Sequence, residues 1–272
     1  MSGSLVHLVV ALDAEAAPLI SWFGLKRQKP ERGFPVFRHA HIALIVSGPG
    51  KSNAAAATAH LHAVCEFPRN ALWLNIGAAG HRELAIGATR VAHAVGDSSA
   101  GRSWYPPLAV TPPWPSARVA TLDKPDLDYE TAELVDMEAS GFYATACRFS
   151  TSELVQVVKI CSDNRGRPAS RLVPQDLTAL VGQELDALDF FLHRLGRLAN
   201  ELAEGNPFDP AHLEPFLARW RFTTSQRQQL EEQIRRWLVI STDDPWPPGI
   251  ESARSAADVI RALCDLQALQ VR

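Results

Sequence analysis

The stretch LVQVVKICSDN, from Leu154 to Asn164, carries the strongest single indication of the fold. Leu154 to Ile160 is rich in β-branched and apolar residues, which predicts a buried strand. The run then ends abruptly in Ser162, Asp163 and Asn164. An acid in this place can cap the next element, or it can hold a proton at the edge of a sheet. The rest of the chain is needed to choose between these interpretations.

Other apolar segments of similar length alternate with segments that favour helices. This alternation predicts an α/β fold in which helices cover both faces of a central sheet. The small residues of GAAG, Gly77 to Gly80, predict a turn, and the prolines of Ser98–Pro115 predict an irregular segment. The further expected strands are Leu5–Leu12, Phe34–Arg38, His41–Val46, Ala71–Ile76, Thr89–Val95, Arg118–Thr121 and Leu134–Val135, and the expected helices begin near Ala14 or span Ser52–Cys65 and Met137–Phe149.

The last hundred residues have a different sequence pattern. Segments such as QDLTALVGQELDALDFFLHRL and SQRQQLEEQIRRWLVI carry apolar residues at helical spacing. We therefore expect an α/β core over residues 1–172 and a helical C-terminal extension over residues 173–272, which can pack on that core.

The composition argues against several classes of function. The 272 residues are 46% hydrophobic and 21% charged, and the formal net charge is −3, so we expect neither nucleic acid nor a membrane as partner. The scattered Cys65, Cys147, Cys161 and Cys264 have no spacing typical of zinc sites or disulfide frameworks. The first apolar run stops at Asp13 and has no basic segment before it. We expect a cytoplasmic protein without metal or cofactor.

The segment SGPGKSN, Ser47 to Asn53, is not a nucleotide-triphosphate loop. A Walker A motif requires a glycine five positions before Gly50, and that position is Ile45. What remains is a glycine turn between a strand and a helix, where backbone N–H groups can approach a ligand oxygen. A tight connection without any ligand is the alternative.

Acidic residues follow several of the predicted strands, and ligands of open α/β sheets bind beyond the carboxyl ends of the strands. For Asp13 and Asp136 we prefer helix capping as the role. Glu15, Glu138 and Asp163 lie at successive strand-to-helix junctions, and this repetition predicts a polar cleft.

Five segments, in this order, resemble the family of nucleosidases and nucleoside phosphorylases, which includes the methylthioadenosine/S-adenosylhomocysteine nucleosidases. VVALDAEAAPL resembles the family's first strand and helix, VSGPGKSNAAAA its SGIGKVNAA turn, LNIGAAG its NTGSAGG segment, LVDMEASGFYATA its EMEA helix start and KICSDN its ISD strand end. The resemblance covers roughly Leu5 to Asn164 and implies a three-layer sandwich with a central mixed sheet, and self-association. The chain departs from the family at Ala78 and His81 and in a compressed segment between Asp97 and Glu133.

The resemblance implies hydrolysis of the N-glycosidic bond of a purine-type nucleoside, such as methylthioadenosine or adenosylhomocysteine. Asp163 matches the general acid at the base, Glu138 the carboxylate that binds the ribose hydroxyls, and Glu15 the residue that activates water. An acid and a base on opposite sides of the bond follow the logic of inverting glycosidases. Further substrate contacts are expected from Ser47, Gly48, Gly77, Ala78, Met137, Phe142 and Ser162.

Two alternatives stay open. A nucleoside phosphorylase needs arginines that converge on phosphate; the basic residues Lys26, Arg27, Arg38 and Arg82 are more simply interpreted as solvated surface. A catalytically inactive nucleoside-binding or scaffold protein would use the apolar stripe of Trp220, Phe222, Leu230, Ile234 and Trp237 for a partner. The charge of Glu15, which would repel phosphate, favours the hydrolase.

Overall fold

The computed structural model describes residues 5–28, 33–66, 70–204, 208–240, 247 and 249–270. The chain divides into two compact units, residues 1–201 and residues 202–272. Helix α4 (Pro174–Gln183) and nearly all of α5 (Leu185–Glu204) belong to the first unit. The two units therefore divide later than the predicted boundary after residue 172. The reason is that these two helices bury apolar side chains against the sheet.

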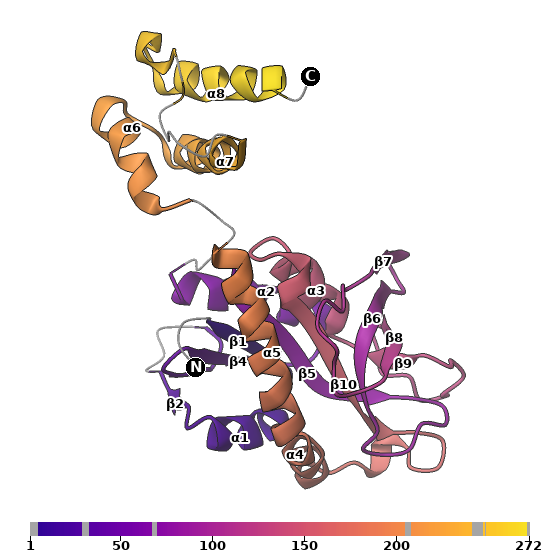
Figure 1. Ribbon diagram of the computed structural model, residues 1–272. Coiled ribbons are helices and arrows are strands. Elements are labelled where there is room, and N and C mark those ends of the chain that lie inside the picture. Colours follow the sequence, from indigo (N-terminus) through magenta and orange to yellow (C-terminus); the bar gives the residue numbers. More distant parts are fainter. Residues whose placement is uncertain are drawn as a thin grey trace. The chain divides into compact units, whose positions relative to one another are not determined.

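The first unit has the mixed α/β architecture that the sequence predicts (Figure 1). At its centre β1 pairs in parallel with β4 on one side and with β5 on the other, and β3 and β2 extend the sheet beyond β4. The strands are β1 (Val6–Val10), β2 (Lys26–Arg27), β3 (Val36–His39), β4 (Ile42–Val46), β5 (Leu72–Gly80), β6 (Thr89–Asp97), β7 (Arg102–Trp104), β8 (Ser116–Thr121), β9 (Leu134–Asp136) and β10 (Val155–Asp163).

Strands β5, β10, β6, β8 and β9 pair in a closed circuit. The GAAG segment lies within β5 and is not a turn, so that prediction is wrong. Gly77 to Gly80 form a ladder with Lys159 to Asp163 of β10, and Gly80 also pairs with Val135 of β9. These small side chains therefore belong to a strand that pairs closely with β10 and β9. This part of β5 extends beyond the residues that pair with β1.

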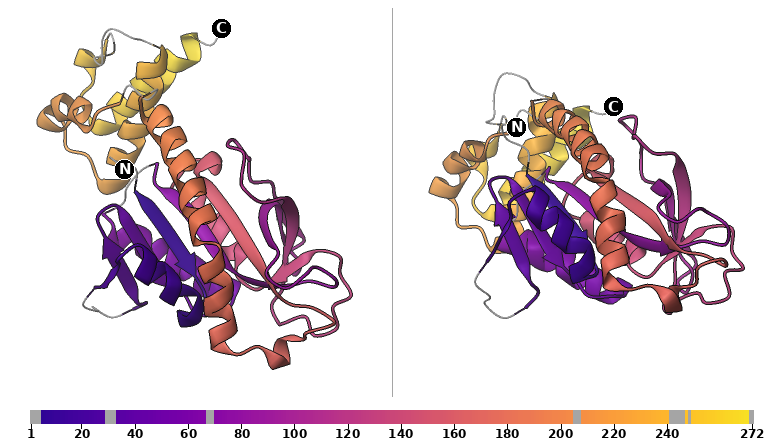
Figure 2. Two further views of the ribbon diagram at one scale, coloured as in Figure 1. Left: turned by 60° about the horizontal axis from the view of Figure 1, so that its bottom comes forward. Right: turned by 90° about the horizontal axis from the view of Figure 1, so that it is seen from below.

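Helices lie on two sides of the sheet, and each side has its own apolar core. Helices α1 (Asp13–Trp22), α4 and α5 pack against one face, as Figure 2 shows for α1 in indigo and α5 in orange. Helices α2 (Lys51–Val64) and α3 (Ala139–Ala146) pack against the other. Alternate residues of β1 serve the two cores, Leu8 on the first face and Val9 on the second.

Several boundaries in the first unit differ from the prediction; strands β5 and β10, for example, extend further, to Gly80 and Asp163. Helix α3 is shorter at both ends than the predicted Met137–Phe149, with Glu138 as its N-cap and Cys147 as its C-cap. Within the segment expected to be irregular, Ser98–Pro115, the short strand β7 pairs with the end of β6, whereas the proline-rich remainder has no regular structure. Prolines lack the N–H that a sheet ladder needs, so the strand occurs only where they are absent.

The second unit is helical, with α6 (Glu214–Arg219), α7 (Thr224–Ile240) and α8 (Ala256–Gln270) around an apolar core of its own. Trp220, Leu230 and Ile234 are buried in that core, and Phe222 packs against it. Most of the apolar stripe therefore packs within the unit. None of the helices in the described part of the chain combines the length and the apolar character that crossing a bilayer requires.

Candidate active site

Glu15, Glu138 and Asp163 line one cavity, although they come from three distant segments of the sequence. Glu15 lies in the first turn of α1, just beyond β1; Glu138 follows β9; Asp163 is the last residue of β10. All three residues are buried, with exposed fractions of 2%, 8% and 8%, respectively. The cavity thus gathers carboxyl groups where several strands end, as the strand-end argument predicts.

The Glu15 carboxylate is held by three backbone N–H groups. Ala11 and Leu12 donate to Oε2 at 3.0 Å each, and Ala78 donates to Oε1 at 2.8 Å. Gly77 allows this approach, because a Cβ built there would lie 2.8 Å from Oε1. Burial raises the pKa of Glu15, and the Ala78 hydrogen bond and the charge of Lys159 oppose that rise only in part. A carboxylate with a raised pKa is a better proton acceptor near neutral pH.

The glycine loop before α2 meets Glu138. The N–H of Gly50 donates to Glu138 Oε1 at 2.7 Å, and Gly50 has a φ of 100°, a conformation that favours glycine. Burial raises the pKa of Glu138, the charge of Lys159 opposes this, and Asp136 adds to it. The loop therefore acts on a protein carboxylate, whereas the sequence suggested a ligand oxygen.

Both oxygens of Asp163 accept hydrogen bonds from hydroxyl groups. Ser162 Oγ donates to Oδ1 at 2.5 Å, and Tyr129 Oη donates to Oδ2 at 2.7 Å. The carboxylate also lies against Gly80, where a Cβ would come within 2.9 Å of Oδ2. Asp163 is therefore fixed in orientation where it lines the cavity.

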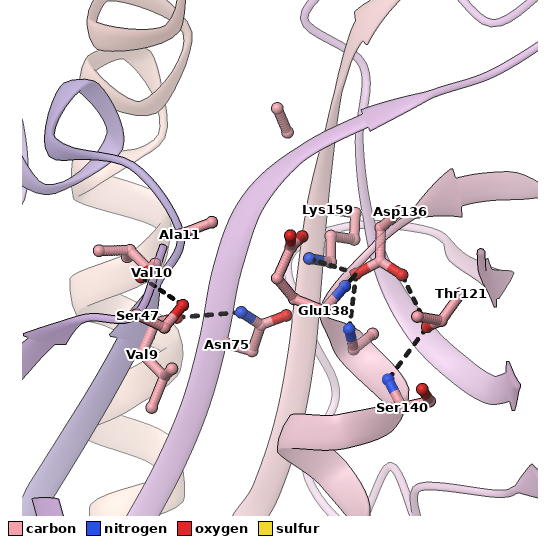
Figure 3. Close-up of polar contacts among 12 residues, drawn as sticks. Val9, Val10, Ala11, Ser47, Asn75, Thr121, Asp136, Glu138, Ser140 and Lys159 are labelled. Carbon is pink, nitrogen blue, oxygen red and sulfur yellow. Dashed lines mark hydrogen bonds and ion pairs between the residues drawn. The ribbon is translucent and has the colours of Figure 1, made fainter. Parts of the chain in front are cut away.

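A buried lysine, Lys159, interacts with Asp136, Glu138 and Glu15, and it is not among the site residues predicted from the sequence. Lys159 is 1% exposed and pairs with Asp136 Oδ2 at 2.8 Å (Figure 3). Burial works against the ammonium charge, but Asp136, Glu138 and Glu15 outweigh it and raise the pKa of Lys159. Its signal in the sequence is a lone cation within a predicted buried strand. It balances the negative charge that the site concentrates.

Asp136 has the structural role that the sequence predicts. Its Oδ2 accepts hydrogen bonds from the N–H groups of Ala139 at 2.7 Å and Glu138 at 3.3 Å at the start of α3, and its Oδ1 accepts from Thr121 Oγ1 at 2.7 Å. These contacts, drawn in Figure 3, fix the backbone from which Glu138 extends.

The structure brings some of the other predicted residues to the cavity and leaves others away from it. Ala78, Met137 and Ser162 line the wall. Ser47 donates to the carbonyls of Val10 and Gly48, and neither Ser47 nor Gly48 lines the cavity. Gly77 contributes through its contact with Glu15. Phe142 is fully buried in the core between α2, α3 and the sheet, so it packs and does not face a ligand.

His81, one of the departures from the family pattern, has a structural role. His81 accepts from the N–H groups of Glu83 and Leu84 at Nδ1 and lies 3.0 Å from the Ala132 carbonyl at Nε2, so it holds a turn.

Among the described residues, no Lys, Arg or His side chain lines the cavity, and no group of His, Cys, Asp and Glu is suited to hold a metal ion.

Comparison with solved structures shows the fold. A structure of 5′-methylthioadenosine nucleosidase from Arabidopsis thaliana in its apo form matches with a TM-score of 0.57 and 19% identity, over 72% of this chain and 96% of that one. A mutant nucleosidase from Helicobacter pylori with 5′-methylthioadenosine in its active site gives 0.56 and 15%, over 71% and 99%. Futalosine hydrolase of Helicobacter pylori gives 0.54 and 17%, over 70% and 98%.

The chain matches no protein-family model and no curated protein sequence. The resemblance carried by the five segments is thus confirmed for the fold: the chain has the fold of the methylthioadenosine/S-adenosylhomocysteine nucleosidases.

Proposed function

We propose that this protein hydrolyses the N-glycosidic bond of a purine-type nucleoside, with 5′-methylthioadenosine and S-adenosylhomocysteine as the first substrates to test. The observation that carries the proposal is the gathering of Glu15, Glu138 and Asp163 around one cavity. The fold shared with nucleosidases supports the choice of reaction.

Cleavage of this bond builds negative charge on the departing base and positive charge on the ribose. Asp163 is the group proposed to deliver a proton to the base nitrogen N7, because Ser162 and Tyr129 fix its orientation. Glu138 is proposed to accept hydrogen bonds from the ribose hydroxyls and to favour the developing cation. Met137, beside it on the wall, is proposed to pack against the sugar.

Glu15 is proposed to take a proton from the attacking water. Its carboxylate must be ionised to do so, and burial raises its pKa above the ordinary 4.5. We therefore expect kcat/KM to fall as the pH drops through that raised value, an acidic limb that lies above pH 4.5. Replacement of Glu15 by Gln should abolish hydrolysis while nucleoside binding persists.

Phosphorolysis is the second candidate reaction, and the charge of the wall argues against it. A phosphate nucleophile needs cationic partners, and the described residues that line the cavity supply Glu15, Asp126, Asp136, Glu138 and Asp163 without a cation among them. Lys159 is occupied by Asp136.

The test is a nucleoside panel in phosphate-free buffer and again with added inorganic phosphate. It should contain 5′-methylthioadenosine, S-adenosylhomocysteine, futalosine, adenosine and inosine, with the free base measured by chromatography. We expect base and free sugar without phosphate. Base release that strictly requires phosphate would assign the phosphorylase reaction, and binding without any release would favour the inactive binding protein.

A further inference from the structure

Tyr129 is the one aromatic side chain on the described wall of the cavity, and the family resemblance assigns it no role. It lies between β8 and β9, in a segment without regular secondary structure. Its backbone has a φ of 52°, a left-handed conformation that non-glycine residues seldom adopt. Its N–H donates to Asp126 Oδ1 at 3.2 Å, as does that of Asp128 at 3.1 Å. A local turn therefore holds the ring inward, where it is 4% exposed.

The Tyr129 hydroxyl joins two loops to the acid. It accepts from the N–H of Ala169 at 2.8 Å and donates to Asp163 Oδ2 at 2.7 Å. Because the amide can only donate, the phenol proton is directed to the carboxylate. Burial and the bond to Asp163 raise the pKa of Tyr129 to about 12, so the hydroxyl keeps its proton at neutral pH.

Both loops contribute residues to the wall of the cavity. Pro125 and Asp126 come from the segment that contains Tyr129, and Ala169 comes from the segment after β10. Strained backbone is found most often at functional sites, where the surroundings determine it. The arrangement at Tyr129 thus sets the orientation of Asp163 from the side opposite to Ser162.

We propose that Tyr129 is a positioning residue for the general acid: its hydroxyl holds Asp163 in the orientation that protonates the departing base. This inference rests on the proposed nucleosidase function. Tyr129 acts through Asp163 and does not itself exchange a proton with the substrate.

The test is a double-mutant cycle on base release with Tyr129→Phe and Asp163→Asn. Misplacement of a catalytic group costs on the order of 100-fold, so we expect Tyr129→Phe to slow kcat about 10-fold to 100-fold. In the Asp163→Asn background the same substitution should change the rate by no more than about twofold, because the acid is already lost. A residue with a merely structural role would slow both enzymes alike.

A second substrate separates the acid from the rest of the site. 4-Nitrophenyl β-D-ribofuranoside releases a stable phenolate that needs no protonation, so Tyr129→Phe should release it within about twofold of the wild-type rate. The matched control is Tyr143→Phe, which removes another buried hydroxyl, one that bonds to Cys147 and lies outside the cavity. It should leave both rates unchanged.

Each outcome decides something. An additive cycle, an unchanged rate of base release in Tyr129→Phe, or equal slowing of both substrates in the wild-type background would overturn the role of Tyr129 and leave the nucleosidase function intact. A wild-type protein that releases no base from any nucleoside would remove the proposed function itself, and the role of Tyr129 with it.

Discussion

Buried polar groups near the carboxyl ends of strands β1 and β5 differ in their hydrogen bonding from those near the amino ends. Beyond the carboxyl ends, Glu15 is 2% exposed and receives three backbone hydrogen bonds. Near the amino ends, His7 is 0% exposed and Trp73 1% exposed, with their rings 4.3 Å apart edge to face. Within the described part of the chain, the two ring nitrogens of His7 and the Nε1 of Trp73 have no hydrogen-bond partner.

The difference shows what each end can do. Burial and the neighbouring His62 and Arg38 lower the pKa of His7 to about 3, so the ring gives up its charge and serves packing. At the other end, burial raises the pKa of Glu15 and Glu138, and backbone N–H groups and the charge of Lys159 oppose that rise. Catalysis needs groups whose charge is sustained in this way, and packing does not. The following variants test that contrast, from the largest expected effect to the smallest.

Asp163→Asn should have the largest effect. It keeps the shape of the side chain and one acceptor oxygen, which can accept from the Tyr129 hydroxyl, while the Ser162 hydroxyl can turn to accept from the new amide N–H. Because the acidic proton is lost, base release should slow by about 100-fold to 10,000-fold. The melting temperature should change little. Asp13→Asn, at an exposed acid that does not line the cavity of Glu15, Glu138 and Asp163, is the control and should retain full activity. Undiminished turnover of Asp163→Asn would remove it from the acid role.

Lys159→Met should have the largest effect on stability. It leaves Asp136 buried without its partner and removes the cation that supports Glu138 and Glu15. Loss of one member of a buried pair costs about 3–5 kcal/mol in the free energy of unfolding, measured by chemical denaturation. Arg118→Met, which breaks a half-exposed pair with Glu133, should cost at most about 1 kcal/mol. Equal costs would mean that the buried pair has no special weight.

Gly77→Ala should harm activity more than stability. The new Cβ would lie 2.8 Å from Glu15 Oε1, so the carboxylate must leave the Ala78 N–H. Misplacement of this size should lower kcat/KM about 10-fold to 100-fold. Gly196→Ala, where a Cβ meets no atom within 4 Å, is the control and should retain wild-type activity. If the two variants are equally active, Glu15 does not need its present position.

His7→Phe should change only the pH dependence of stability. Below pH 6.5 the unfolded chain protonates His7, whereas the folded protein does not until about pH 3, so acid lowers the free energy of unfolding. One such group changes the free energy of unfolding by at most about 1.4 kcal/mol per pH unit. When the pH is lowered from 7 to 5, the free energy of unfolding of His7→Phe should therefore fall by about 2 kcal/mol less than that of the wild type. Parallel curves for the two proteins would show that His7 is solvated in the folded state.

The sequence predicts the α/β pattern because strand ends, glycines and helix starts are local signals. The three acids were found for the same reason, since each follows a strand. The GAAG turn was mispredicted because strand pairing with β9 and β10 is a long-range property that overrides local preference. Tyr129 and Lys159 were missed because their roles depend on partners distant in the sequence. A lone lysine within a predicted buried strand and a lone aromatic residue in the segment before Glu133 are the signals that could have indicated them.

The most direct test of the central claim is a crystal structure of the Asp163→Asn variant with 5′-methylthioadenosine. The account predicts that the nucleoside lies in the cavity with its ribose hydroxyls on Glu138, its base beside position 163 and a water molecule on Glu15. A nucleoside bound elsewhere, or one whose glycosidic bond faces none of these three groups, would contradict it.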